Sequence, residues 1–123
     1  MHIGLIGGIG PAATVVYYER LVAAFRARGR VLELTIAQAD VQVLARNAEA
    51  DDRAAQAAVY ARHLAQLKGA GADFGSITSI GGHFCYAETE AISPCRWSAP
   101  LRRSMPDWRR AACAASACWG RGR

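Results

Sequence analysis

Paired cysteines and long apolar runs are both missing from this 123-residue sequence. The four cysteines stand at positions 85, 95, 113 and 118, and they form neither a CxxC pair nor a zinc-ligand pattern. No apolar run approaches the roughly 20 residues of a membrane span. The N-terminus also lacks the basic region and cleavage site of a secretory signal. These absences predict a cytoplasmic protein with reduced thiols, no bound metal and no membrane contact.

Tryptophan is absent from residues 1–94, which also have no excess of positive charge. This part has eight Lys/Arg and nine Asp/Glu, whereas residues 95–123 have seven Arg, one Asp, all three Trp and three Cys. The formal net charge of +5 therefore comes from residues 95–123. Nucleic-acid binding needs a basic patch on a folded face, so the charge does not predict it. We divide the chain into an α/β domain, 1–94, and an irregular, poorly ordered tail, 95–123.

The opening of the chain is an apolar strand, a glycine turn and the start of a helix. Gly7, Gly8 and Gly10 can adopt backbone angles closed to other residues and let a ligand approach the main chain. Pro11 suits the first helical position, where its missing N–H costs nothing. The free N–H groups of this first turn and the helix dipole favour an anion. The opening therefore predicts a carboxylate or phosphate site.

Hydrophobic periodicity predicts alternating strands and helices, and therefore a parallel sheet. The expected strands are 2–7, 31–37 and 74–79; the expected helices are 11–28, 50–68 and 85–92; and residues 40–45 form a loop leading into a short helix. The buried stripe of the first helix is expected to comprise Val15, Tyr18, Leu21, Val22 and Phe25, whereas His2 and His63 are expected at the surface.

The first and third strands both end in glycine-rich loops, 7–10 and 79–83. Ligands bind beyond the carboxyl ends of such strands, so both loops should lie on one rim.

The segment Ile3-Gly-Leu-Ile-Gly-Gly-Ile-Gly-Pro-Ala-Ala-Thr14, followed by Tyr17-Tyr18, resembles the opening of the aspartate/glutamate racemase family. Gly71-Ala72-Asp73-Phe74 resembles the start of that family's second signature. The resemblance covers about residues 1–94. It implies a three-layer sandwich with a parallel sheet, the first of two similar domains. It also implies racemisation of aspartate, glutamate or a related amino acid by proton abstraction at Cα, without a cofactor.

This sequence departs from the family pattern at the catalytic positions. Ser79 stands where the family has its catalytic cysteine, and Ile80-Gly81 replaces Asn-Thr, while His83 is retained. Family members use one thiol from each of two domains, and this chain has room only for the first. We therefore expect little or no racemase activity from this truncated chain.

Residues 95–123 are interpreted as a frameshifted tail. Reading each codon from the last base of one residue and the first two of the next converts Asp107–Trp108 to leucine and Trp119–Gly120 to glycine. The remaining junctions permit a helix end, a glycine and an apolar strand, much like the start of the family's second domain. Sequencing the gene tests this hypothesis.

Racemisation without a cofactor requires two acid/base groups and stabilisation of the charge that develops on the substrate carboxylate. The backbone N–H groups between Gly8 and Thr14, in the turn that contains Gly10 and Pro11, suit stabilisation of the carboxylate charge. The Thr14 hydroxyl offers one more donor. His83 can activate Ser79 or act as the base itself. Alternatively, Ser79 caps the next helix.

Two further residues have open interpretations. Cys85 is either a displaced catalytic thiol or a small buried apolar group. Asp40 either contacts a substrate amine or is a solvated loop carboxylate. The expected partner is a small amino acid or carboxylate, and the apolar edges of a small sheet favour a homo-oligomer.

Two other functions remain open. One is a non-catalytic domain that binds a small carboxylate or phosphate. The other is a dinucleotide-binding oxidoreductase fragment, because Gly8-x-Gly10-x-x-Ala13 meets a loose fingerprint. That fingerprint needs an acidic residue at the end of the second strand. Glu33 lies near the start of that strand and Asp40 lies beyond it, so this reading is weaker.

Overall fold

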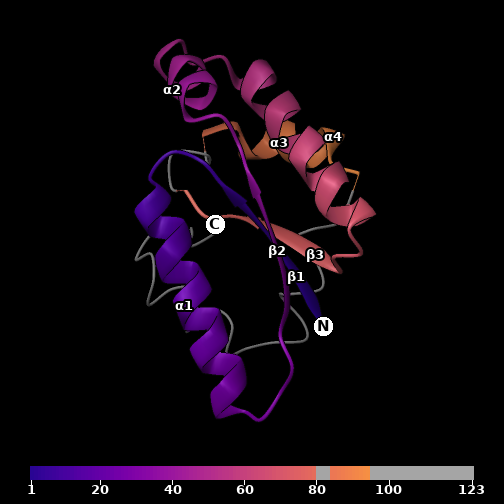
Figure 1. Ribbon diagram of the computed structural model, residues 1–123. Helices are drawn as coiled ribbons and strands as arrows, with labels where there is room; N and C mark the ends of the chain where they lie inside the picture. The colour runs from indigo at the N-terminus through magenta and orange to yellow at the C-terminus, as the bar shows by residue number, and fades with distance from the viewer. Residues whose placement is uncertain (80–83, 95–123) are drawn as a thin grey trace.

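The computed structural model describes residues 1–79 and 84–94, which form an α/β fold with a three-stranded parallel sheet (Figure 1). The predicted α/β class and parallel sheet are confirmed. The strand order is β2-β1-β3. The elements in chain order are β1 (His2–Gly7), α1 (Pro11–Ala27), β2 (Glu33–Gln38), α2 (Val41–Glu49), α3 (Arg53–Gly69), β3 (Phe74–Ile77) and α4 (Tyr86–Ile92).

Strand β1 is central because it is apolar on both faces, as expected of a strand covered on both sides. Ile3 and Leu5 point to one face and pack with α1, while Ile6 points to the other face and packs with α3. Figure 1 shows α1 on one side of the sheet, and α3 and α4 on the other. The core therefore consists of two apolar clusters separated by the sheet. The α1-side cluster contains Ile3, Leu5, Tyr17, Leu21, Phe25 and Phe74. The α3-side cluster contains Ile6, Ala39, Leu44, Tyr60, Leu64, Leu67, Ile77 and Cys85.

The predicted buried stripe of α1 is partly wrong. Leu21 and Phe25 are buried as expected, together with Thr14 and Tyr17. The side chains of Val15, Tyr18 and Val22 instead remain 53%, 48% and 40% exposed. The cause is that apolar residues extend around more of α1 than the sheet can cover, so the pattern alone could not choose between two neighbouring stripes.

Glycine lets α3 lie close to the sheet. Gly4 and Gly75 are register partners on β1 and β3. A Cβ at Gly4 would lie 2.8 Å from Leu67 Cδ1, and a Cβ at Gly75 would lie 2.7 Å from Leu64 Cδ2. Side chains of α3 therefore occupy the space that larger residues would need on these two strands.

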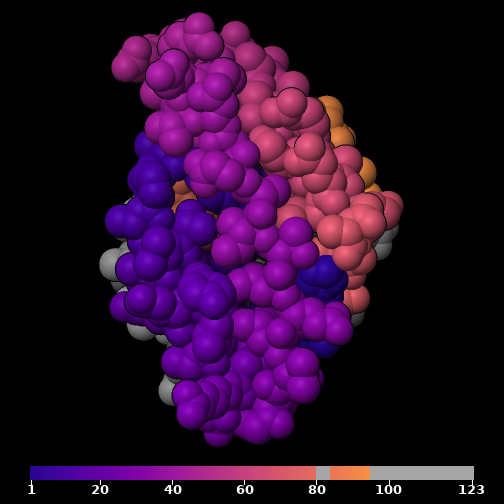
Figure 2. Space-filling model, viewed as in Figure 1, coloured from indigo at the N-terminus to yellow at the C-terminus, as the bar shows by residue number. Residues whose placement is uncertain are grey.

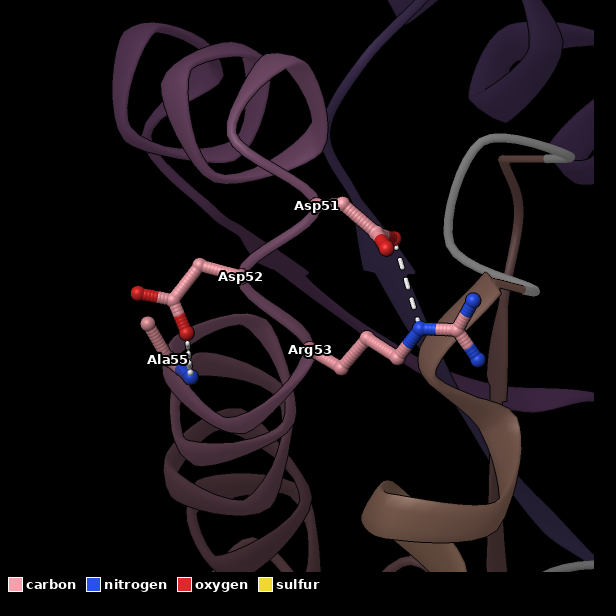
Figure 3. Close-up of polar contacts among 4 residues, drawn as sticks. All are labelled: Asp51, Asp52, Arg53 and Ala55. Atoms are coloured by element: carbon pink, nitrogen blue, oxygen red, sulfur yellow. Dashed lines mark hydrogen bonds and ion pairs between the residues drawn. The ribbon is translucent and has the colours of Figure 1, made fainter.

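Helices α2 and α3 each begin directly after an aspartate N-cap, and their predicted first residues were wrong. Asp40 Oδ1 accepts a hydrogen bond from Gln42 N at 2.8 Å, so a helix begins at Val41 where a loop was expected. Asp52 Oδ1 accepts from Ala55 N at 3.0 Å, so α3 begins at Arg53 and not at residue 50 (Figure 3). Each cap satisfies a backbone donor that the helix itself leaves free.

The turn before α3 also contains an exposed ion pair. Asp51 has a φ of 49° and its Oδ1 lies 3.3 Å from Arg53 Nε (Figure 3). Exposed pairs of this kind contribute about 0–1 kcal/mol, so the aspartate cap matters more to the helix start.

Two strand boundaries and one histidine also differ from expectation. Strand β2 begins at Glu33, because Val31 precedes the sheet and is 81% exposed. Strand β3 ends at Ile77, two residues early, since its register with β1 ends at the Ile6–Ile77 pair. His63 is buried and not at the surface, and its Nδ1 lies 2.8 Å from Gln66 Oε1, which supplies the partner that a buried ring needs.

Candidate functional site

The carboxyl ends of β1 and β3 meet the N-terminus of α1 at one rim of the sheet. Thr78 follows β3, and its N–H donates to Ile6 O at 3.1 Å. Thr78 Oγ1 also lies 2.8 Å from Thr14 Oγ1 in the first turn of α1. The chain leaves β1 toward β2 on one side and later returns to β3 on the other, which is where such sheets bind ligands.

The predicted convergence of the two strand-end segments is therefore present as far as Ser79. The side chain of Ser79 is buried, directly after Thr78. His83, Ile80 and Gly81 lie outside the described residues, so the expected Ser79–His83 pairing stays a prediction. Helix α4 has Cys85 in its N-cap position, which shows that Ser79 does not cap this helix.

Gly10 is the residue that opens the start of α1 to a ligand. It occupies the N-cap position with φ 80° and ψ 74°, a left-handed conformation that suits glycine. A Cβ at this position would have no atom of the described residues within 4 Å, so no described side chain covers the main chain here. Pro11 is the first helical residue and carries no N–H. Within the described residues, the N–H of Ala12 has no hydrogen-bond acceptor, and it is therefore available to an anion.

Gly7 and Gly8 also have a packing role that was not predicted. Neither is among the glycines with positive φ, which within residues 1–79 and 84–94 are Gly10, Gly29 and Gly71. A Cβ at Gly8 would lie 2.4 Å from Leu44 Cδ1, and one at Gly7 would lie 2.6 Å from Gln38 Oε1. These two glycines are needed for packing against neighbouring side chains, and close approach of a ligand to the main chain at Gly8 stays a prediction.

The Thr14 hydroxyl is not the free donor that was expected. Thr78 Oγ1 donates to Ile6 O at 3.0 Å, and a carbonyl oxygen can only accept. The proton in the Thr14–Thr78 hydrogen bond must therefore come from Thr14. Thr14 keeps lone pairs but no spare proton, so it can face a substrate amine and not a carboxylate.

Cys85 lies in the core and lacks the properties of a displaced catalytic thiol. It is completely buried and belongs to the α3-side cluster. Burial raises its pKa above the usual value, and Sγ lies 3.6 Å from Thr89 Oγ1. A base needs an accessible thiol with a lowered pKa. The second interpretation, a small buried apolar group, fits this environment.

We expect Cys85 to resist alkylation in the folded protein. Because only the accessible thiolate reacts, iodoacetamide at mildly alkaline pH should label Cys85 at least about 100-fold more slowly in native protein than in denaturant. Mass spectrometry of the peptide containing Cys85 measures both rates. Equal rates in the two conditions would contradict the buried position.

Asp40 follows β2 and is exposed on the same side as the rim. Its Oδ1 caps α2 by accepting from Gln42 N at 2.8 Å and Val43 N at 3.4 Å. The structure therefore assigns it a local role, and contact with a substrate amine stays a prediction.

Two residues of the rim were not found from the sequence. Thr78 links β1, β3 and α1 through its backbone and hydroxyl, and Gln38 ends β2 with its Oε1 beside Gly7. The polar residues at the end of β2 and directly after β3 were the available signal, because the carboxyl ends of parallel strands share one edge.

The chain was compared with protein-family models, with curated proteins and with solved structures. None of the three comparisons finds a match. The resemblance to the racemase family therefore rests on the motifs of residues 3–18 and 71–74. Within the part of the chain that the structure covers, no helix is long and apolar enough to cross a membrane. No group of three His, Cys, Asp or Glu residues is gathered for a metal ion in residues 1–79 and 84–94.

Proposed function

We propose that residues 1–94 are the first domain of an aspartate/glutamate racemase-type protein and bind the carboxylate of a small amino acid at the rim. In this proposal the helices on both faces of the sheet make the three-layer sandwich of that family. The observation that supports it is the position of the α1 N-terminus, with Gly10 open to ligand, against the segment that bears Ser79. The helix dipole and the Ala12 N–H stabilise a carboxylate there.

For this 123-residue chain we propose binding without turnover. Ser79 supplies a hydroxyl where the family has a thiol, and Cys85 lies in the core. A hydroxyl is a weak base unless another group activates it, and racemisation requires a second base on the opposite face of Cα. A dinucleotide site fits less well, because Asp40 lies beyond β2 and caps α2.

Calorimetry with L-aspartate, L-glutamate and inorganic phosphate tests binding, and incubation of the same amino acids in deuterated water tests proton exchange. We expect heat of binding from at least one carboxylate and no enzyme-dependent loss of the α-hydrogen by NMR. Rapid α-hydrogen exchange would contradict the absence of turnover. Binding of phosphate alone would support the alternative, a non-catalytic phosphate-binding domain.

Replacing Gly10 with valine should weaken carboxylate binding about tenfold or more, because the side chain covers the main-chain donors and disfavours the left-handed conformation. Gly29→Val is the matched control. Gly29 also has a positive φ, of 60°, and open space around its Cβ position, but it follows the far end of α1. Calorimetry should show normal affinity for Gly29→Val. Equal loss of affinity in both variants would place the site elsewhere.

A further inference from the structure

Helix α1 has two apolar sides, and the sheet covers only one of them. The covered side packs against β1 through the cluster that contains Leu21. On the neighbouring flank, Val15, Tyr18 and Val22 follow one another at helical spacing and remain 53%, 48% and 40% exposed. A helix of a small monomeric domain normally presents polar residues there.

Strand β2 adds a further apolar residue on this side of the sheet. Ile36 is the register partner of Leu5, so both side chains point to the face that α1 covers. Leu5 is fully buried, but Ile36 is 42% exposed because β2 is an edge strand. Figure 2 shows α1 and β2 adjoining each other on the near face of the molecule. We call Val15, Tyr18, Val22 and Ile36 the α1 surface.

Charged side chains on the same flank of α1 can pair with those of a second copy of the chain. Glu19 and Arg26 are both exposed, and each lies within one turn of Val22, on opposite sides of it along the helix. Neither forms an ion pair within the described residues. When two such helices lie antiparallel and are centred just after Val22, Glu19 of each copy faces Arg26 of the other. One contact thus brings two pairs of opposite charge together.

We propose that the α1 surface is where a second copy of this chain docks, with the two α1 helices antiparallel about a twofold axis near Val22. An interface of this kind uses the same patch on both copies and closes at the dimer. Ala27 ends α1 about 8 Å beyond Val22, whereas Val15 lies about 10 Å before it. Val15 of each copy therefore reaches the α1–β2 connection of the other, where Val31 is 81% exposed.

The interface predicts a weak dimer. Helix α1 has 17 residues, so it is about 25 Å long, and one flank of it with part of an edge strand falls at the low end of specific interface sizes. Sedimentation of the full chain should therefore show a monomer–dimer equilibrium across a concentration series that extends to the millimolar range.

Charge reversal tests whether a second copy of the chain binds the α1 surface and whether the two α1 helices lie antiparallel. Glu19→Arg and Arg26→Glu each place like charges opposite one another twice and should raise the dimer Kd about tenfold. The double variant Glu19→Arg/Arg26→Glu restores both attractions and should dimerise like the natural chain. An equimolar mixture of the two single variants should form a heterodimer. Both residue changes are on the exposed flank, and circular dichroism checks that each of the three variants is folded.

The outcomes separate the proposal from its alternatives. Recovery of association in both the double variant and the mixture supports the antiparallel dimer. A monomer at every concentration overturns it, and shows that the α1 surface has a different occupant or none. A dimer that is indifferent to all charge changes also overturns it, because the contact must then lie elsewhere. None of these outcomes depends on ligand binding at the rim.

Discussion

Replacing Gly4 with valine is expected to reduce the free energy of unfolding by about 3 kcal/mol. The Cβ of the new side chain would lie 2.8 Å from Leu67 Cδ1 and 3.1 Å from Leu67 Cβ. A rotamer change can move the Cδ1 atom but not the Cβ, so α3 must move away from the sheet. Valine favours strands by less than about 1 kcal/mol, which does not compensate. Because domains of this size are stable by only about 5–15 kcal/mol, the loss should be plain in urea unfolding.

Gly69→Ala provides the matched control for this prediction. Gly69 is the last residue of α3, and a Cβ there would meet no atom within 4 Å in the part of the chain that the structure describes. Alanine in a helix is favoured over glycine by about 0.5–1 kcal/mol, so this variant should be as stable as the natural chain or slightly more so. If Gly4→Val matched Gly69→Ala in urea midpoint, α3 would not lie as close to β1 as the structure shows.

Raising the pH from 10 to 12 should destabilise the fold by about 2 kcal/mol through Tyr60 alone. Burial raises the pKa of Tyr60 from 10.0 to about 12. Above pH 10 the unfolded chain loses the phenol proton while the folded chain keeps it, so the unfolded state is favoured as the pH rises. The stabilisation is complete below pH 10 and is lost as the pH approaches 12. The raised pKa of Cys85 acts in the same direction.

Urea unfolding at a series of alkaline pH values measures this effect. Tyr60→Phe keeps the ring in the core and removes the titrating group, so its stability should fall less steeply between pH 10 and 12. Tyr18→Phe, at an exposed position of α1, should behave like the natural chain. Parallel pH curves for all three proteins would show that Tyr60 is accessible to solvent in its ionised form.

The secondary structure was predictable where the local pattern is unambiguous. The apolar run of β1 predicted that strand closely, and the glycines after α1 and at the end of α3 predicted where these helices end. Helix α2 was predicted only in part, as a short helix after a loop at 40–45, because the role of Asp40 as its N-cap was not recognised. The buried side of α1 was predicted poorly because two apolar stripes compete, and only the width of the sheet decides between them.

The candidate site shows the same division between local and distant information. The conformation of Gly10 follows from the local turn and was anticipated. The role of Gly8 was not, since it depends on Leu44, a residue of another helix. The state of the Thr14 hydroxyl depends on Thr78 and Ile6, which the fold brings from two other strands. Contacts between segments far apart in sequence leave no mark on either segment alone.

The strand order has a consequence for synthesis of the chain on the ribosome. Strands β1 and β2, with α1 between them, are complete once residue 38 has emerged, but the partner on the other edge of β1 is residues 74–77. Throughout that interval the second edge of β1 lacks its native partner, and the Ile6 face lacks the cover of α3 until residue 69 has been made. The nascent chain is therefore most exposed to wrong strand pairing in this interval, and arrival of β3 ends it.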